Sequence, residues 1–161
     1  MPEGPVVANT TPLLALWLLG RLDLLRDLYG EVLIPPTVQA EFLAAETTLR
    51  QMALTDTPWI RVIQLAEPQR ALAYAGLDRG EAEVLALAEE QAARLVIIDE
   101  RAARRYARRL DLPLTGTIGV LLLAKDNKLT GNIRPLIEAL HQSGMYLEET
   151  LIERVLQLAG E

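Results

Sequence analysis

The sequence predicts an α/β fold, with helices covering both faces of a mainly parallel sheet of four to five strands. Short apolar runs of strand length alternate along the chain with segments whose apolar residues have helical spacing. Such alternation is typical of parallel sheets covered by helices. Residues 95–98 (LVII) are continuously apolar, as expected for a central strand buried on both faces.

The strands are expected at five apolar runs, of which the last is the weakest. They are VVA at residues 6–8, EVLIP at 31–35, IRVIQL at 60–65, RLVIID at 94–99 and LPL at 112–114. The segments between these runs have the spacing of helices, so each connection can return the chain to the same edge of the sheet.

Proline and glycine mark the ends of the expected helices. Thr11-Pro12 starts the first helix and Gly20 ends it, while Gly30 ends the helix before the second strand and Pro35-Pro36 starts the next. Residues 76–91 (GLDRGEAEVLALAEEQ) predict a further helix, and the last third of the chain predicts two helices separated at residues 143–144. Residues 55–59 (TDTPW) are expected to form an exposed loop.

Length and composition restrict the class of protein. A chain of 161 residues that is 50% hydrophobic can bury one core but is short for two, so we expect a single domain over residues 1–161. The net charge of −6 argues against a protein that coats nucleic acid through bulk charge, so any such contact needs a local basic patch. The absence of cysteine excludes disulfides, thiolate nucleophiles and Cys-based zinc sites.

The sequence shows no targeting signal and gives little reason to expect catalysis by histidine. No segment reaches the roughly 20 apolar residues of a membrane span, and the N-terminus lacks a secretory pattern, so we expect a cytoplasmic protein without membrane contact. The single histidine, His141, lies near a predicted helix end, where a solvated surface role is favoured over catalysis.

Candidate functional residues lie where predicted strands end, because ligands of parallel α/β sheets bind at that edge. Asp99 follows the strand LVII directly. An aspartate before a helix is also a good N-cap, and position alone does not decide between capping and function. The first strand ends at Asn9, a neutral amide at a place where an acidic metal ligand would be expected. Thr10 and Thr11 offer hydroxyls there or cap the helix.

Two glutamates on predicted helices complete the acidic candidates. Glu41 lies among apolar neighbours, where a carboxylate is seldom buried without a partner or a metal; otherwise it marks the boundary of the core. Glu81 and Glu83 begin a helix whose dipole favours acids in the first turn. They are roughly 200° apart around the helix, so we expect Glu81 to point along the sheet edge and Glu83 into solvent.

A basic stripe follows Asp99. Its five arginines fall within an arc of roughly 140° on a helix whose other face is apolar; they are Arg101, Arg104, Arg105, Arg108 and Arg109. The stripe suits contact with the phosphates of a nucleic acid, since guanidinium groups bind phosphate in a bidentate way. The alternative is an exposed helix whose arginines pair with the many glutamates.

Four segments together resemble a PIN domain, in the branch of small prokaryotic PIN-like proteins described as predicted nucleic acid-binding proteins. These are VVANTTPLLAL at residues 6–16, VLIPPTVQAEFL at 32–43, GLDRGEAEVLALA at 76–88 and LVIIDERAARRYARRLDLPLTGTIGVLLLAK at 95–125. The likeness covers residues 5 to about 130, and the final helices fit the same branch less specifically.

The resemblance implies a three-layer α/β/α fold whose acidic residues bind Mg²⁺ or Mn²⁺ and hydrolyse RNA phosphodiesters. It places the four acidic positions of the family at Asn9, Glu41, Glu81 and Asp99, with Glu100 as an alternative for the fourth. Glu41, Glu81 and Asp99 would then be the catalytic, metal-binding carboxylates. Asn9 departs from the pattern: its amide oxygen can bind the ion, but one of four charges is missing.

Three functions follow from these observations. The first is a metal-dependent endoribonuclease acting on RNA, such as the toxin half of a toxin–antitoxin pair, for which the partner is an antitoxin-like protein. The second is a catalytically impaired module of the same fold that binds nucleic acid or protein. The third, a receiver-type phosphotransfer domain, is disfavoured because that chemistry needs acids at the first strand. Whether the chain forms a homo-oligomer is left open.

Overall fold

The computed structural model describes residues 3–161 and contains one five-stranded, all-parallel sheet of order β3-β2-β1-β4-β5. The strands are β1 (Val6–Ala8), β2 (Val32–Ile34), β3 (Ile60–Val62), β4 (Leu95–Ile97) and β5 (Leu114–Thr115). In the central pair, Val6, Val7 and Ala8 lie opposite Leu95, Val96 and Ile97. The ends of β1 and β4 are therefore side by side at the carboxyl edge.

The predicted α/β fold is confirmed, with the sheet flanked by helices in three layers. All three residues of β1 and of β2 are buried, as the apolar runs indicated. The fifth strand forms two residues later than its expected start, because pairing begins where the carbonyl of Pro113 accepts the N–H of Val96 (2.8 Å). Proline lacks the N–H that would extend the ladder in the other direction.

Nine α-helices and one 3₁₀-helix are present within residues 3–161. They are α1 (Thr10–Leu18), α2 (Asp23–Tyr29), α3 (Pro36–Phe42), α4 (Thr47–Thr55), η1 (Pro68–Ala73), α5 (Arg79–Glu90), α6 (Arg101–Arg109), α7 (Thr117–Asp126), α8 (Arg134–Gln142) and α9 (Glu149–Leu158). The sequence did not reveal α4, because all nine of its residues remain at least partly exposed and no apolar face marks it.

The expected exposed loop at residues 55–59 is partly wrong. Thr57 is only 6% exposed, and its hydroxyl donates to the carbonyl of Ala53 (3.0 Å). Trp59 donates its indole N–H to the carbonyl of Leu22 (3.3 Å). The loop is thus anchored at two points, because the Thr57 hydroxyl and the Trp59 indole N–H each bond to a backbone carbonyl.

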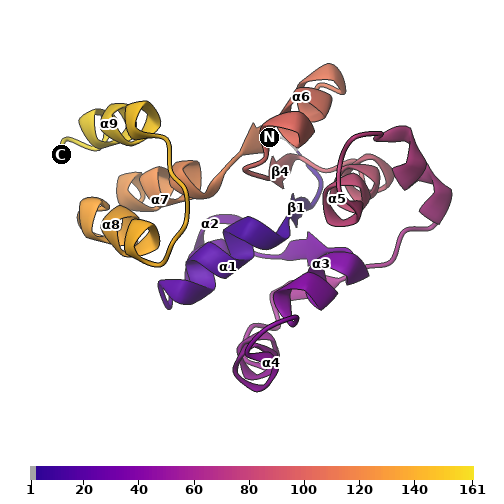
Figure 1. Ribbon diagram of the computed structural model, residues 1–161, viewed down its shortest axis with the longest axis horizontal. Coiled ribbons are helices and arrows are strands. Elements are labelled where there is room, and N and C mark those ends of the chain that lie inside the picture. The colour runs from indigo at the N-terminus through magenta and orange to yellow at the C-terminus, as the bar shows by residue number, and fades with distance from the viewer. Residues whose placement is uncertain (1–2) are drawn as a thin grey trace.

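The helices pack on the sheet and on one another in distinct groups (Figure 1). α5 packs on β1 and β4, α3 packs between α1 and α5, and α7 packs against α1, α2 and α9. Figure 1 shows α7, α8 and α9 grouped at one end of the molecule, with α6 beside β4 and α4 projecting beyond α3. Within the described part of the chain, no helix is long and apolar enough to cross a membrane.

Candidate functional site

The end of β1 presents a buried amide. Asn9 is 4% exposed, and its backbone N–H donates to the carbonyl of Ile97 on the neighbouring strand (2.9 Å). Its side-chain Oδ1 has no hydrogen-bond partner within residues 3–161. A buried polar atom without a partner is costly, and it is therefore a place where a bound ligand would recover free energy.

Thr10, which follows Asn9, holds Glu41 of α3 at this end of the sheet. The Thr10 hydroxyl donates to Glu41 Oε2 at 2.6 Å, which joins the first turn of α1 to α3. The Thr10 hydroxyl therefore lies in the candidate site, where it bonds to a carboxylate of another helix, and does not cap α1. On the other side, a Cβ at Gly80 would collide with Glu41 Oε1, so glycine at this position lets the carboxylate lie where it does against α5.

Glu81 lies at the start of α5 and is 8% exposed. It forms a capping box with Asp78: the Glu81 N–H donates to Asp78 Oδ1 (2.8 Å), and the Asp78 N–H donates to Glu81 Oε2 (3.2 Å). Burial, together with the negative charges of Asp78 and Glu100, raises the pKa of Glu81 to about 7. A cation at this carboxyl would favour its ionised form.

The expectation that Glu83 is solvated is wrong. Its side chain is 14% exposed, and it lies 3.6 Å from the Arg79 guanidinium as an ion pair along α5. The helix presents apolar residues on most sides, so a position opposite Glu81 is also largely covered. Glu83 is therefore a partly buried carboxylate, and within residues 3–161 its Oε2 has no hydrogen-bond partner.

Asp99 follows β4 and bonds to a helix far along the chain. Thr117, the first residue of α7, donates its N–H to Asp99 Oδ1 (2.8 Å) and its hydroxyl to Oδ2 (2.6 Å). A Cβ at Gly116 would collide with Oδ1. Asp99 therefore does cap a helix, but that helix is α7. The next helix along the chain, α6, has Glu100 at its N-cap, and no side chain bonds to its first turn there.

The polar residues gather in two groups along one edge of the sheet. Asn9, Thr10 and Glu41 lie together against the start of α5, which carries Glu81. Asp99 lies one strand away and turns toward α7. Within residues 3–161, no three acidic or histidine side chains already stand in an arrangement that could hold a metal ion. His141 is exposed on α8 and takes no part in this edge.

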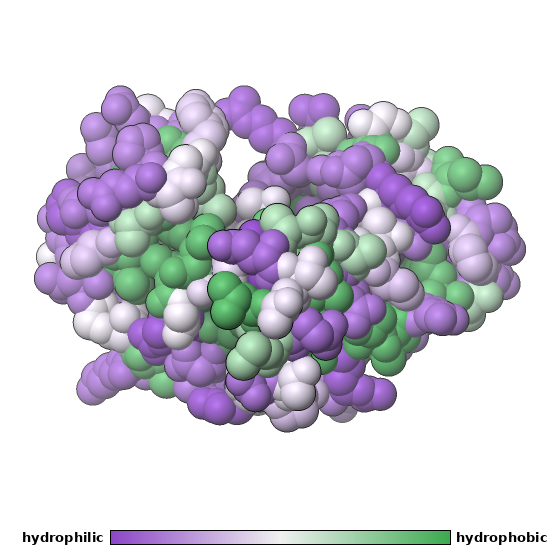
Figure 2. Space-filling view, turned by 60° about the horizontal axis from the view of Figure 1, so that its bottom comes forward, coloured by the Kyte–Doolittle hydropathy of each residue, from purple (hydrophilic) through white to green (hydrophobic). Residues whose placement is uncertain are grey.

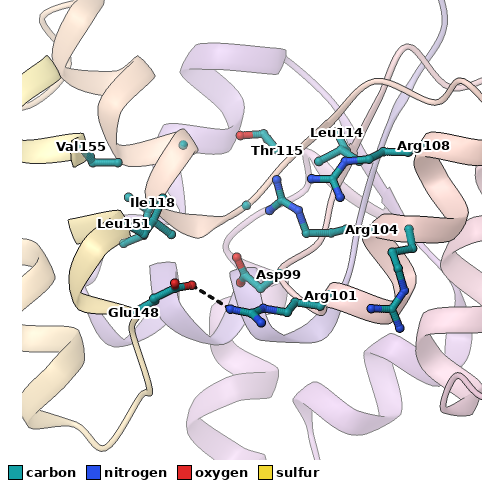
Figure 3. A pocket seen from close by; sticks show the side chains of 13 residues that line it. Asp99, Arg101, Arg104, Arg108, Leu114, Thr115, Ile118, Glu148, Leu151 and Val155 are labelled. Carbon is teal, nitrogen blue, oxygen red and sulfur yellow. Dashed lines mark hydrogen bonds and ion pairs between the residues drawn. The ribbon is translucent and has the colours of Figure 1, made fainter. Parts of the chain in front are cut away.

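The arginine stripe borders a pocket of about 580 Å³ beside Asp99 (Figure 3). Four of the five predicted arginines line it, namely Arg101, Arg104, Arg105 and Arg108. Arg109 lies outside, over the ring of Tyr106 (5.6 Å). Arg101 pairs with Glu148 at 2.9 Å, which matches the alternative of surface ion pairs. In the described chain, Arg104, Arg105 and Arg108 pair with no carboxylate.

Arg104 is the least exposed arginine of this group. Its Nη1 donates to the carbonyl of Ile98 (3.3 Å). Burial and the neighbouring Arg108 lower its pKa, while the Asp99 carboxylate acts in the opposite direction. The Arg104 guanidinium therefore stands between a carboxylate and a second cation, and an anion in the pocket would relieve the repulsion.

The residues at the edge fit a divalent cation in three respects. Asn9 offers a buried oxygen without a partner, and Glu81 is a buried carboxyl that other carboxylates disfavour as an anion. Because Gly80 has no Cβ, a carboxylate oxygen of Glu41 lies against it. Gly116 accommodates an oxygen of Asp99 in the same way. Carboxylate and amide oxygens are the ligands that Mg²⁺ and related ions prefer.

Thr117 was not identified from the sequence as part of the site, and neither was Asp78. Thr117 follows Gly116 within residues 95–125, and a glycine before a threonine at the start of an apolar run indicates the N-terminus of a helix. Asp78 precedes Glu81 by three residues, which is the spacing of a capping box.

A parallel sheet with amide and carboxylate oxygens at the ends of its central strands defines an α/β protein whose candidate site lies at the carboxyl edge. The chain belongs to the PIN-domain family: residues 5–161 match a family model described as a PIN domain. The predicted resemblance is confirmed, and the match includes the final helices. No curated protein matches the chain. Membership places the chain in a family of nuclease type, whose members generally use divalent metal ions.

Proposed function

We propose that this chain is a divalent-metal-dependent endoribonuclease, with Mg²⁺ or Mn²⁺ held by Asn9, Glu41, Glu81 and Asp99. One observation carries the proposal: the unpartnered, buried Oδ1 of Asn9 lies at the end of β1, next to the Thr10–Glu41 pair and the start of α5. An ion at this position would satisfy the amide oxygen, and its charge would oppose the burial and the like charges that raise the pKa of Glu81.

Each residue of the site has a separate role in this proposal. A bound divalent ion would orient water and stabilise the charge that develops on the phosphate. Thr10 orients Glu41 through its 2.6 Å hydrogen bond, and Thr117 orients Asp99 through two. Glu81, with a pKa of about 7, can release its proton near neutral pH when the ion is present.

RNA is the proposed substrate because unpaired arginines lie directly beside Asp99. Arg104, Arg105 and Arg108 line the adjoining pocket and can hold phosphates near the metal. The toxin role implied by the sequence resemblance belongs to this proposal. Its test is growth arrest when the chain is expressed in a bacterial host, and relief of that arrest by an antitoxin-like partner.

The alternative is a binding module of the same fold without catalysis. Two observations favour it: the neutral Asn9 stands where an acid is expected, and both oxygens of Asp99 are already occupied by Thr117. In this case the arginines bind nucleic acid or a partner protein, and the carboxylates serve only to hold α1, α3, α5 and α7 together.

A cleavage assay on single-stranded RNA separates the two functions. With Mn²⁺ the wild-type protein should cleave, and EDTA should abolish cleavage. Glu41→Gln and Glu81→Gln should each reduce the rate by about 100-fold or more, as loss of a catalytic group does. Glu89→Gln, an exposed position on α5, is the matched control and should be active.

Gly80→Ala tests the geometry without removing any charge. The added Cβ would displace the Glu41 carboxylate, which is the end of a flexible side chain, so the fold should persist while cleavage falls. Wild-type protein that binds RNA but shows no cleavage with Mn²⁺ or Mg²⁺ would refute the nuclease and favour the binding module.

A further inference from the structure

The pocket beside Asp99 has two unlike walls. Arginines of α6 form one wall, and aliphatic side chains of α7 and α9 form the other (Figure 3). In the space-filling view, a notch bordered by hydrophilic residues separates the end of the molecule that carries the C-terminal helices from the rest (Figure 2). The pocket volume of about 580 Å³ lies within the range of small-molecule and cofactor sites.

The wall formed by the arginines of α6 can bind an anion. Arg104 and Arg108 point into the pocket from successive turns of α6, on the same side as Asp99 (Figure 3). Within residues 3–161 neither of them pairs with a carboxylate, although the chain carries 22 acidic residues. Arg101 differs, because its guanidinium pairs with Glu148 at 2.9 Å, and this pair also lines the pocket (Figure 3). Planar guanidinium groups match the oxygens of a phosphate.

The opposite wall is apolar. Ile118 of α7 and Leu151 and Val155 of α9 face the arginines across the pocket (Figure 3). Ile118 and Val155 are nearly buried, at 5% and 6% exposed, whereas Leu151 is 44% exposed and so presents its side chain to an occupant. A free phosphate would leave this wall unused. The pocket therefore suits a ligand with a phosphate at one end and an apolar face at the other.

We propose that this pocket holds one unpaired nucleotide of an RNA strand, with its phosphate on Arg104 and Arg108 and its base on Leu151, Ile118 and Val155. This inference rests on the proposed function, since it assigns a substrate subsite next to Asp99. A base within a duplex is paired and stacked, so only single-stranded RNA can place a base against the wall. α9 thereby becomes part of the substrate site, and the Arg101–Glu148 ion pair links its N-terminal end to α6.

The test uses the full chain in EDTA, so that it does not depend on metal or on cleavage. Two-dimensional ¹H–¹⁵N spectra are titrated with adenosine 5′-monophosphate, with inorganic phosphate and with adenosine. The nucleotide should shift amides of both α6 and α9 and saturate, whereas inorganic phosphate should shift those of α6 and the start of α7. The nucleotide should bind about five-fold or more tightly than inorganic phosphate, as burial of a base against aliphatic side chains would give.

Two matched pairs of variants separate the walls. Leu151→Ser should weaken nucleotide binding about five-fold and leave inorganic phosphate binding unchanged. Leu158→Ser, a more exposed position of α9 outside the pocket, should bind both ligands as the wild type does. Arg108→Gln should weaken both ligands, and Arg109→Gln, on the same helix but outside the pocket, should weaken neither.

Three results would overturn the subsite. They are equal affinity for nucleotide and inorganic phosphate, equal effects of the two leucine variants, and nucleotide shifts that avoid α9. If these appear while Mn²⁺-dependent cleavage persists, the subsite is wrong and the nuclease stands. If nucleotide binding follows the expected pattern while cleavage is absent, the subsite stands and the nuclease is wrong.

Discussion

Thr117 holds both oxygens of the Asp99 carboxylate, with its N–H at 2.8 Å from Oδ1 and its hydroxyl at 2.6 Å from Oδ2. The two residues are 18 positions apart, and their bonds tie the end of β4 to the start of α7. A carboxylate is stabilised there by the unpaired N–H groups and the dipole of the helix. The same contacts fix the direction in which Asp99 faces the arginine pocket.

Removal of the Thr117 hydroxyl should destabilise the protein and loosen Asp99. Thr117→Val keeps the shape of the side chain, and we expect it to lower the free energy of unfolding by about 2 kcal/mol, the usual contribution of a hydrogen bond to a charged group. Urea denaturation measures the loss. Thr117→Ser keeps the hydroxyl and should retain most of the stability; equal stability of the valine variant and the wild type would contradict this role.

The charge missing at Asn9 can be restored. Asn9→Asp is nearly isosteric, and without metal it should lower the melting temperature, because a buried carboxylate is added near Glu41 and Glu81. With the ion present, we expect binding of Mn²⁺ to tighten about ten-fold or more and cleavage to rise. Calorimetric titration measures the first and the RNA assay the second.

Asn9→Ala is the control for this change, since it removes the oxygen and should weaken Mn²⁺ binding. An aspartate variant that gains neither metal affinity nor cleavage would count against the nuclease and in favour of the binding module.

The raised pKa of Glu81 predicts a pH-dependent stability. In the folded protein its pKa is about 7, compared with 4.5 for an unperturbed glutamate. Between these two values the folded state holds a proton that the unfolded state has lost, so stability falls as pH rises from about 4.5 to about 7. Glu81→Gln keeps a hydrogen-bond acceptor but cannot ionise, so this fall should disappear.

Urea denaturation in EDTA at several pH values tests this dependence. At pH 8 the glutamine variant should be more stable than the wild type, and at pH 4 the two should be similar. A constant difference across this range would show that burial of Glu81 does not perturb its ionisation. Added Mn²⁺ should reduce the wild-type disadvantage at high pH, because a nearby cation favours the ionised carboxylate against its burial and its acidic neighbours.

The unpaired arginines predict salt-dependent RNA binding. Replacement of Arg104, Arg105 and Arg108 by alanine should weaken binding to single-stranded RNA of any sequence. If all three contact phosphates, the slope of log affinity against log salt should become shallower by about 2. Fluorescence anisotropy at several salt concentrations measures both quantities, with Arg109→Ala as the control. An unchanged slope would show that these three arginines do not contact RNA phosphates.

Glu161 stabilises the C-terminal helices through its charge. Its carboxylate accepts the N–H groups of Ile133 and Arg134, at 2.8 Å and 3.0 Å, and the ammonium of Lys125 at 2.9 Å. Burial alone would raise its pKa, but these donors outweigh burial and lower it to about 2. The contribution to stability is therefore complete above about 4.5 and is lost as pH falls toward 2.

Glu161→Gln should consequently be less stable than the wild type at pH 7, with the difference closing as the solution is acidified to pH 2. Thermal unfolding across this range measures the difference. Glu153→Gln changes an exposed carboxylate on α9 and should follow the wild type at every pH. A deficit that does not depend on pH would mean that the carboxylate acts through shape alone.

The sequence by itself determined the alternation of strands and helices, the central place of residues 95–98 and the basic stripe on α6. Each of these is a local pattern, because an apolar run or a periodic face reports which side of a short segment is buried. The positions of Asn9 and Asp99 at strand ends followed from the same patterns, since parallel strands all end at one edge. Local signals failed at α4, which has little apolar surface to bury.

Only the tertiary structure decided what each polar side chain contacts. The strand order β3-β2-β1-β4-β5 places Asn9 beside the end of β4, and it brings Thr117 to Asp99 and Thr10 to Glu41. The burial of Glu83, the raised pKa of Glu81 and the aliphatic wall from α9 likewise depend on packing between segments far apart in sequence. The physical reason is that desolvation and hydrogen bonding depend on neighbours in space, which a local pattern cannot specify.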